Sequence, residues 1–430
     1  MQSKKDIVVG GGLGGLACAA LLARAGRPVV VFEKAAAVGG RAASQQEAGA
    51  WLNLGPHALY RGGAGRRVLT ELGVEPAGAV PNGSGSLALD GESVHALPVG
   101  LVSMLSTGLL RLGEKLEVAR VLQGLGSIDP DRLGGQSVEA WIESVVSRPG
   151  ARQLLRALVR VTTYVNAPEI AAADEAVRQL QLGLSSGVTY VDGGWQTIAD
   201  SLRACAVAAG AEVHTSTRVE AVSPGEVRLA GGQTVAAGAV VIAAGPSVAA
   251  ALVPDSRALA AAASAAVPVR AACLDLALSA LPRPRAIFCL GVDQPLYYSV
   301  HSATARVAPD GVHVVHAARY LAPGETADAS SIEAMLDRLQ PGWRAHVLAR
   351  RFLPQLVVAS DLHQVGRPHP GPAVVDAPGV FAVGEWVGQG AMLADASLAS
   401  AKAAASCILE EERAARPRRP AAEEPAQAWG

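Results

Sequence analysis

The chain opens on an alternation of short apolar runs and glycine-rich turns. Residues 7–9 form an apolar run that predicts a buried parallel strand. Five glycines lie within residues 10–15, and the alanine- and leucine-rich stretch 16–25 predicts a helix that ends at Gly26. A second apolar run at 29–32 predicts another buried strand. The pattern therefore predicts a strand–helix–strand unit with parallel strands.

The turn inside this unit carries a phosphate-binding pattern. Gly10, Gly12 and Gly15 occupy the three glycine positions of G-x-G-x-x-G. The first allows a tight turn, the second lets a pyrophosphate approach the backbone, and the third lets the helix pack on the strand. The helix N-terminus offers free N–H groups to the phosphates. Glu33 ends the second strand, where an acid accepts hydrogen bonds from ribose hydroxyls, so the unit predicts a bound dinucleotide.

Five further segments extend the pattern along the chain. They are Val38-Gly39-Gly40-Arg41-Ala42, the Gly-Pro-His segment at 53–58, the Gly-Gly-Trp helix start at 190–198, the strand at 217–222 and the segment 379–388. Together with the glycine-rich turn, this set resembles the flavin-containing amine oxidase and phytoene desaturase superfamily, and it is nearer to the phytoene desaturase-related proteins. The resemblance implies an FAD-dependent oxidoreductase.

The resemblance also implies which residues hold FAD. In the last segment Glu385 stands where the family usually has Asp, so its carboxylate reaches one methylene further. The helix that begins at Met392 would point its positive end at the flavin. No cysteine falls in a flavin-facing motif, so we expect noncovalent FAD. The implied cofactor-binding residues are Gly10, Gly12, Gly14, Gly15, Glu33, Lys34, Gly40, Arg41, Gly55, Pro56, His57, Val219, Gly245, Gly384, Glu385 and Met392.

The spacing of these motifs predicts an α/β protein in which one domain is inserted into another. The first insertion has apolar residues at helical spacing, and the second reads as strands interrupted by a helix at Ser331–Leu339. We expect a Rossmann-type FAD-binding domain with an inserted α+β substrate domain, an antiparallel sheet backed by helices. The expected boundaries are 1–64, 186–250 and 371–409 for the FAD-binding domain, 65–185 and 251–370 for the substrate domain, and a disordered tail at 410–430.

Composition narrows the partners and the compartment. The formal net charge is −1 over 430 residues and aromatic residues are 4% of the chain, which gives no reason to expect nucleic acid. The five cysteines are scattered, as in a reducing compartment. Lys4-Lys5 precedes too short an apolar run for a signal peptide, so we expect a cytoplasmic protein. The apolar stretch 97–110, followed by Arg111, Lys115 and Arg120, predicts either peripheral membrane contact or a helix that covers the cavity.

Few side chains outside the cofactor motifs suggest chemistry. The resemblance places His57 near the flavin, where it is either catalytic or a structural imidazole of the Gly-Pro turn. Trp195, Tyr164 and Tyr297 are candidates to line the substrate cavity, with core packing as the alternative. His313 and His316 would point to opposite faces of a strand, so we expect no metal site.

The function that we expect is removal of hydride from a hydrophobic small molecule, by desaturation of an isoprenoid-like substrate. The alternatives are amine oxidation on the same fold, a redox-neutral flavin isomerase and a non-enzymatic binder that resembles Rab GDP dissociation inhibitors. We find one G-x-G-x-x-G placed between a strand and a helix, which argues against a second, nicotinamide-binding fold. The expected electron acceptor is therefore oxygen, a quinone or a carrier.

Overall fold

A computed structural model describes residues 4–83 and 85–415 of the chain. The predicted strand–helix–strand unit is confirmed as β1, α1 and β2, with both strands parallel and fully buried. It is the centre of a five-stranded parallel sheet in the order β10-β2-β1-β14-β20. The bounds are β1 Asp6–Val9, α1 Leu13–Arg24, β2 Val29–Phe32, β10 Glu212–His214, β14 Val240–Ile242 and β20 Val380–Ala382.

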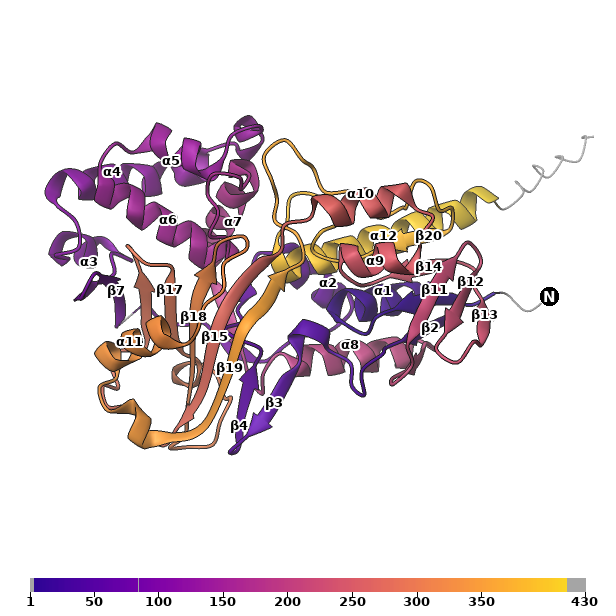
Figure 1. Cartoon of the computed structure of the whole chain (residues 1–430), viewed down its shortest axis with the longest axis horizontal. Coiled ribbons are helices and arrows are strands. Elements are labelled where there is room, and N and C mark those ends of the chain that lie inside the picture. Colours follow the sequence, from indigo (N-terminus) through magenta and orange to yellow (C-terminus); the bar gives the residue numbers. More distant parts are fainter. Residues whose placement is uncertain (1–3, 84, 416–430) are drawn as a thin grey trace, which may run out of the picture.

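Helices and a small sheet cover the two faces of this parallel sheet (Figure 1). One face packs on α1, α2, α8 and α12, and the other on the antiparallel sheet β11-β12-β13 and the short helices α9 and α10. Apolar strands buried on both sides are what a parallel sheet of this class requires. The bounds are α2 Ala64–Glu71, α8 Gln196–Ala208, α9 Pro246–Leu252, α10 Arg257–Ala265, α12 Leu393–Ala415, β11 Val219–Ser223, β12 Glu226–Leu229 and β13 Thr234–Ala236.

The second large sheet has seven strands, in the order β19-β15-β18-β17-β16-β7-β8. Helix α11 packs on one face of this sheet, and the helices α4 to α7, which lie within residues 112–186, pack against the other. The long strands β15 and β19 run side by side toward the parallel sheet (Figure 1). The bounds are β7 Ser86–Asp90, β8 Ser93–Ala96, β15 Val269–Leu278, β16 Phe288–Gly291, β17 Leu296–Val300, β18 His313–Leu321, α11 Ser330–Leu339 and β19 Val347–Ala359.

The other strands and α-helices belong to neither of these two large sheets. They are the hairpin β3 Ser44–Glu47 and β4 Ala50–Asn53, the short strands β5 Leu59–Tyr60, β6 Gly78–Ala79 and β9 Val188–Val191, and the helices α3 Leu101–Ser106, α4 Leu112–Gly124, α5 Val138–Val145, α6 Pro149–Thr163 and α7 Ala173–Ser186. Figure 1 shows α3 to α7 gathered together at the side of the molecule that lies away from β11–β13.

Segment 65–185 consists mostly of helices, and it also supplies β7, which pairs in parallel with β16 and so joins the sheet of the second insertion. One expectation needs correction. Residues 410–415, expected to be disordered, continue α12, where Ile408 and the turn before it are still buried against the parallel-sheet core. The rest of the expected tail, 416–430, lies outside the described residues. The domain boundaries themselves remain a proposal.

Candidate cofactor and active site

The three motif glycines have different surroundings. Gly10 has a φ of +112°, and a Cβ there would lie 2.5 Å from the carbonyl oxygen of Ala243. A Cβ on Gly15 would lie 2.0 Å from the carbonyl oxygen of Gly10. At Gly12, in contrast, a Cβ would meet nothing within 4 Å. The first glycine therefore allows the close approach of the ends of β1 and β14, and the third allows α1 to pack on the end of β1. The second leaves open space at the N-terminus of α1, which fits a pyrophosphate.

Glu33, predicted to bind the ribose, also holds the glycine-rich loop by hydrogen bonds. Its carboxylate is buried and accepts hydrogen bonds from the N–H of Gly11 at 2.6 Å and of Ala35 at 2.8 Å. A carboxylate has about four lone-pair sites, so these two bonds leave acceptor capacity for ribose hydroxyls. The neighbouring Lys34 is exposed. The ribose role of Glu33 is compatible with this geometry, and Glu33 is also part of the loop's own structure.

The second glycine pair lies against the phosphate loop. Gly39 donates its N–H to the carbonyl oxygen of Gly11 at 2.8 Å. A Cβ on Gly40 would lie 3.5 Å from the Cα of Gly12. The glycine-rich turn and the Gly-Gly-Arg segment therefore form one surface, and Arg41 projects from its edge.

Arg41 and Glu385 form a bidentate ion pair across 344 residues of sequence. Glu385 is 3% exposed and also accepts a hydrogen bond from the N–H of Ser360 at 2.5 Å. Burial by itself would raise the pKa of this carboxyl, but the charge and hydrogen bonds of Arg41, with those of Ser360, lower the pKa to about 2. The Arg41 side chain remains 41% exposed, which leaves it room to contact a diphosphate.

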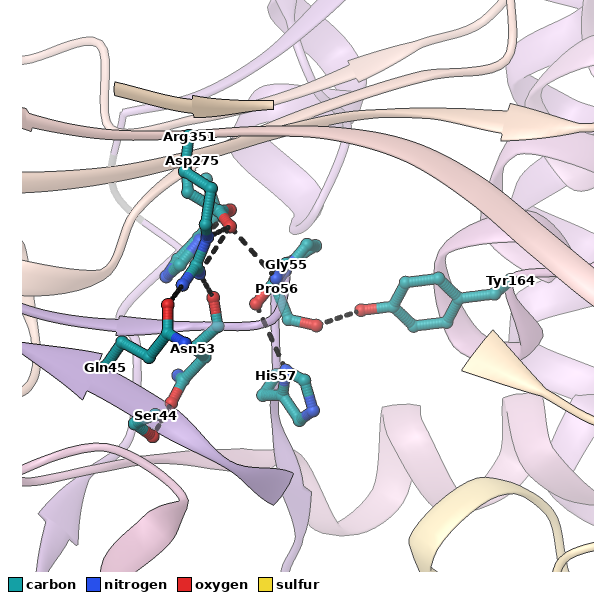
Figure 2. Close-up of polar contacts among 10 residues, drawn as sticks. Ser44, Gln45, Asn53, Gly55, Pro56, His57, Tyr164, Asp275 and Arg351 are labelled. Atoms are coloured by element: carbon teal, nitrogen blue, oxygen red, sulfur yellow. Dashed lines mark hydrogen bonds and ion pairs between the residues drawn. The ribbon is translucent and has the colours of Figure 1, made fainter. Parts of the chain in front are cut away.

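The Gly-Pro-His segment follows β4 and lies against β15 and β19 of the seven-stranded sheet, and Figure 2 shows it beside Asp275 and Arg351 of these strands. Gly55 has a φ of +74°, and a Cβ there would lie 2.9 Å from the sulfur of Cys273. Nδ1 of His57 lies 3.1 Å from the carbonyl oxygen of Gly55, and its ring meets Trp195 edge-on at 4.8 Å between centroids. Burial lowers the pKa of His57 to about 4, so the imidazole is neutral at pH 7.

A wall of aromatic rings begins at this segment. The hydroxyl of Tyr164 donates to the carbonyl oxygen of Pro56 at 2.7 Å (Figure 2). The Tyr164 ring meets Tyr320 at 5.6 Å, Tyr320 meets Tyr297 at 6.5 Å, and Tyr297 meets Phe288 at 5.6 Å, all edge-to-face. The structure thus brings the predicted Tyr164 and Tyr297 together. Sequence reasoning missed Tyr320, which lies four residues after His316 on β18 and therefore on the same face of the strand.

The remaining residues predicted to bind the cofactor lie in different elements of the fold. Val219 begins β11, Gly245 is the N-terminal cap of α9, and Met392 directly precedes α12. At Gly384 a Cβ would lie 2.8 Å from the indole nitrogen of Trp386. A Cβ on Gly14 would lie 2.8 Å from a methyl carbon of Val383, so Gly14 packs closely against this residue. Their cofactor roles remain proposals.

A polar hollow of about 190 Å³ lies beside the loop that precedes α12. Glu175 of α7, which sequence reasoning missed, accepts a hydrogen bond from the N–H of Gly390 at 2.8 Å, and burial raises the pKa of its carboxyl. The hollow is also lined by His363, Arg367 and Gln389. This bond connects helix α7 to the loop between the last flavin motif and α12.

His313 and His316 are three residues apart in the regular part of β18, opposite Leu278 and Asp275 of β15, and therefore point to opposite faces of the strand. Between residues 4 and 415, position 84 aside, no three His, Cys, Asp or Glu side chains gather in a group that could hold a metal ion.

Comparison of the sequence with known protein families gives one match. The model for flavin containing amine oxidoreductases matches residues 13–275, which is more than half of the chain. No protein of curated function matches the sequence.

Solved structures share the fold at low sequence identity. An oxidoreductase from Methanosarcina mazei is 21% identical, with a TM-score of 0.75 over 94% of this chain and 100% of that one. Putrescine oxidase bound to putrescine is 15% identical, with a TM-score of 0.72 over 95% and 99%. Cyclohexylamine oxidase from Brevibacterium oxydans is 15% identical, with a TM-score of 0.70 over 95% and 100%. From the family match, this chain belongs to the flavin-containing amine oxidoreductases and is an FAD-dependent oxidoreductase.

Proposed function

We propose that the chain removes hydride from a hydrophobic small molecule that binds beside the junction of the Gly-Pro-His segment and the aromatic wall. The observation that carries this proposal is the bond from Tyr164 to Pro56, which joins the wall to the segment expected beside the flavin. FAD, when bound, supplies the hydride acceptor. The chain's own residues position the substrate: aromatic faces contact its apolar surface, and the neutral His57 offers a hydrogen-bonding nitrogen.

Noncovalent attachment of FAD is supported by the state of Cys273. This cysteine packs against Gly55, but it is fully buried, and burial raises the pKa of its thiol well above the ordinary value. A protonated thiol is a poor nucleophile.

Two reactions fit this site, and one observation favours the second. Desaturation of an isoprenoid-like substrate needs only an apolar cavity beside the flavin. Amine oxidation is favoured by the gathering of Tyr164, Tyr297, Tyr320 and Phe288 in one wall, although the chain as a whole is poor in aromatic residues. The family and the two amine oxidases of similar fold point the same way.

Anaerobic reduction of the bound flavin tests the proposal and separates the two reactions. We expect a hydrophobic amine or an isoprenoid from a mixed panel to bleach the visible absorbance of the purified holoenzyme. Tyr164→Phe should slow this bleaching about three- to tenfold, since one hydrogen bond contributes about 0.5–1.5 kcal/mol. A flavin that dithionite reduces but no panel member reduces would contradict the proposed substrate class.

We also propose that α3 and α4 contact a membrane surface, from which an apolar substrate would enter. Four aliphatic side chains on these helices are between 65% and 80% exposed: Val102, Leu105, Leu112 and Leu116. On α4 the acids Glu114 and Glu117 turn inward to Gly150, Ser147 and Arg148. The cations Arg111 and Lys115 are left beside the exposed leucines, a pattern typical of interfacial helices. No helix in the described part of the chain has the length and apolar character needed to cross a membrane.

Cosedimentation with vesicles of phosphatidylcholine and phosphatidylglycerol tests this contact. We expect the parent protein to pellet with these vesicles, and the triple variant Leu105→Ser, Leu112→Ser, Leu116→Ser to stay in the supernatant. Leu184→Ser and Leu348→Ser remove exposed leucines elsewhere and serve as the matched control. Equal pelleting of the triple variant and the control would contradict the membrane contact, and concentration-dependent self-association without vesicles would assign the surface to a second copy.

A further inference from the structure

A row of polar residues crosses four neighbouring strands of the seven-stranded sheet. Cross-strand pairing aligns Arg351 of β19 with Asp275 of β15, Asp275 with His316 of β18, and His316 with Ser299 of β17. Directly opposite residues on adjacent strands share one face of a sheet. The preceding residue on that face of β15 is Cys273, which packs against Gly55, so the row faces the Gly-Pro-His segment.

The row is buried and ionic. Asp275 and His316 are 0% exposed and Ser299 is 1% exposed, while the side chain of Arg351 is 13% exposed. The carboxylate of Asp275 is bound on both sides, by Nδ1 of His316 at 2.6 Å and by Nη2 of Arg351 at 2.8 Å. Buried ion pairs add little net stability over apolar residues of similar volume. Stability of the sheet therefore gives no account of why charged groups stand here.

The contacts of the row lead to one segment. Asp275 Oδ2 accepts a hydrogen bond from the N–H of Gly55 at 3.2 Å. Arg351 donates to the carbonyl oxygen of Asn53 and, at 3.1 Å, to the side-chain oxygen of Gln45. Figure 2 shows that the bonds to Asn53 and Gly55 meet the backbone shortly before His57. The ring of His57 is in turn held by the carbonyl oxygen of Gly55.

We propose that Asp275, oriented by His316 and Arg351, is a positioning residue for His57. Its carboxylate fixes the left-handed turn at Gly55, and this turn sets where Pro56 and His57 stand relative to the flavin and the aromatic wall. Arg351 holds the same strand end from the Asn53 side, so the segment is clamped on both sides of Leu54. Small displacements of a positioned group have large effects on rate, about 100-fold for 1 Å. The proposal rests on the proposed function of this site.

Asp275→Asn in the FAD-loaded enzyme tests this role, because Asn keeps the volume and loses the charge. We expect full FAD content, an altered visible circular dichroism spectrum of the bound flavin, and reduction by substrate slowed about tenfold or more with little change in half-saturation. Tyr298→Phe is the matched control: it removes a buried hydroxyl with bonds to Ala286 and Gln340 on the opposite face of the same sheet. We expect it to leave both readouts unchanged.

Arg351→Gln gives a second route to the same readouts where Asp275→Asn does not fold, since Arg351 is partly exposed and its loss releases Asn53. An Asp275→Asn or Arg351→Gln holoenzyme with the flavin spectrum and reduction rate of Tyr298→Phe would overturn the proposal. That result would leave the proposed function intact, whereas a parent protein that binds no flavin would overturn both.

Discussion

Gly12→Ala is expected to yield a folded protein that has lost FAD. Gly12 has a φ of −76° and a ψ of 179°, which alanine adopts without strain, and a Cβ would meet no atom of the chain within 4 Å. The methyl group would instead occupy the open space at the N-terminus of α1, where the pyrophosphate is proposed to lie. We expect an affinity loss of at least about 100-fold, or roughly 3 kcal/mol. Titration of the apoprotein with FAD measures it.

Gly15→Ala should behave differently, and the contrast makes the test specific. A Cβ at Gly15 would lie 2.0 Å from the backbone oxygen of Gly10, so strand and helix must separate. We expect a lower melting temperature of the apoprotein for Gly15→Ala and an almost unchanged one for Gly12→Ala. Gly124→Ala, in a helix end with open space around it, is the control that should change neither property. Gly12→Ala protein with parental FAD affinity would show that the phosphates do not approach this glycine.

The part of the fold that the sequence predicted best is the part fixed by short-range signals. Strand, turn and helix between residues 6 and 32 each have their own local pattern, and the structure confirms all of them. The strands β7 and β8, at one side of the seven-stranded sheet, have no such local pattern. They are short, sit among helical segments, and become strands because β7 finds β16 some 200 residues away. Pairing partners of this kind override local propensity.

The site residues follow the same division. Glu33 could be placed from its distance to the glycine-rich turn, because both belong to one unit. Asp275 could not be interpreted, since on the sequence it only interrupts the apolar run of a strand. The role of Asp275 can be inferred only from the tertiary structure, in which β18 and β19 place His316 and Arg351 on either side of it. The aromatic wall is similar: Tyr164 and Tyr320 come from a helix end and a strand that only tertiary structure joins.

Glu385→Gln is expected to remove a large part of the stability of the apoprotein at neutral pH. The pKa of Glu385 is lowered from 4.5 to about 2, chiefly by Arg41 against the opposing effect of burial. A depressed carboxyl pKa stabilises the folded state above the unfolded pKa, and that stabilisation is lost as the pH falls through the folded pKa. The shift corresponds to about 3 kcal/mol at pH 7. In the parent, this contribution should decline between pH 4.5 and about pH 2.

Urea unfolding of the apoprotein at pH 7, 4 and 3 measures the effect. The Gln variant should be less stable at pH 7, and its stability should fall less steeply with acid. Glu212→Gln breaks an exposed pair with Lys5 and is the control, expected to change stability by less than about 1 kcal/mol.

FAD binding by the same variants separates the two roles of this carboxylate. If Glu385 also accepts a cofactor hydroxyl, Glu385→Gln should weaken FAD binding about tenfold, because a charge-assisted bond becomes neutral. Glu385→Asp keeps the charge but shortens the reach by one C–C bond, about 1.5 Å. It should retain most of the FAD affinity where the loop at Gly384 can follow. A Gln variant that is destabilised yet binds FAD as tightly as the parent would confine Glu385 to holding Arg41, and the cofactor contact would then belong to the half-exposed side chain of Arg41.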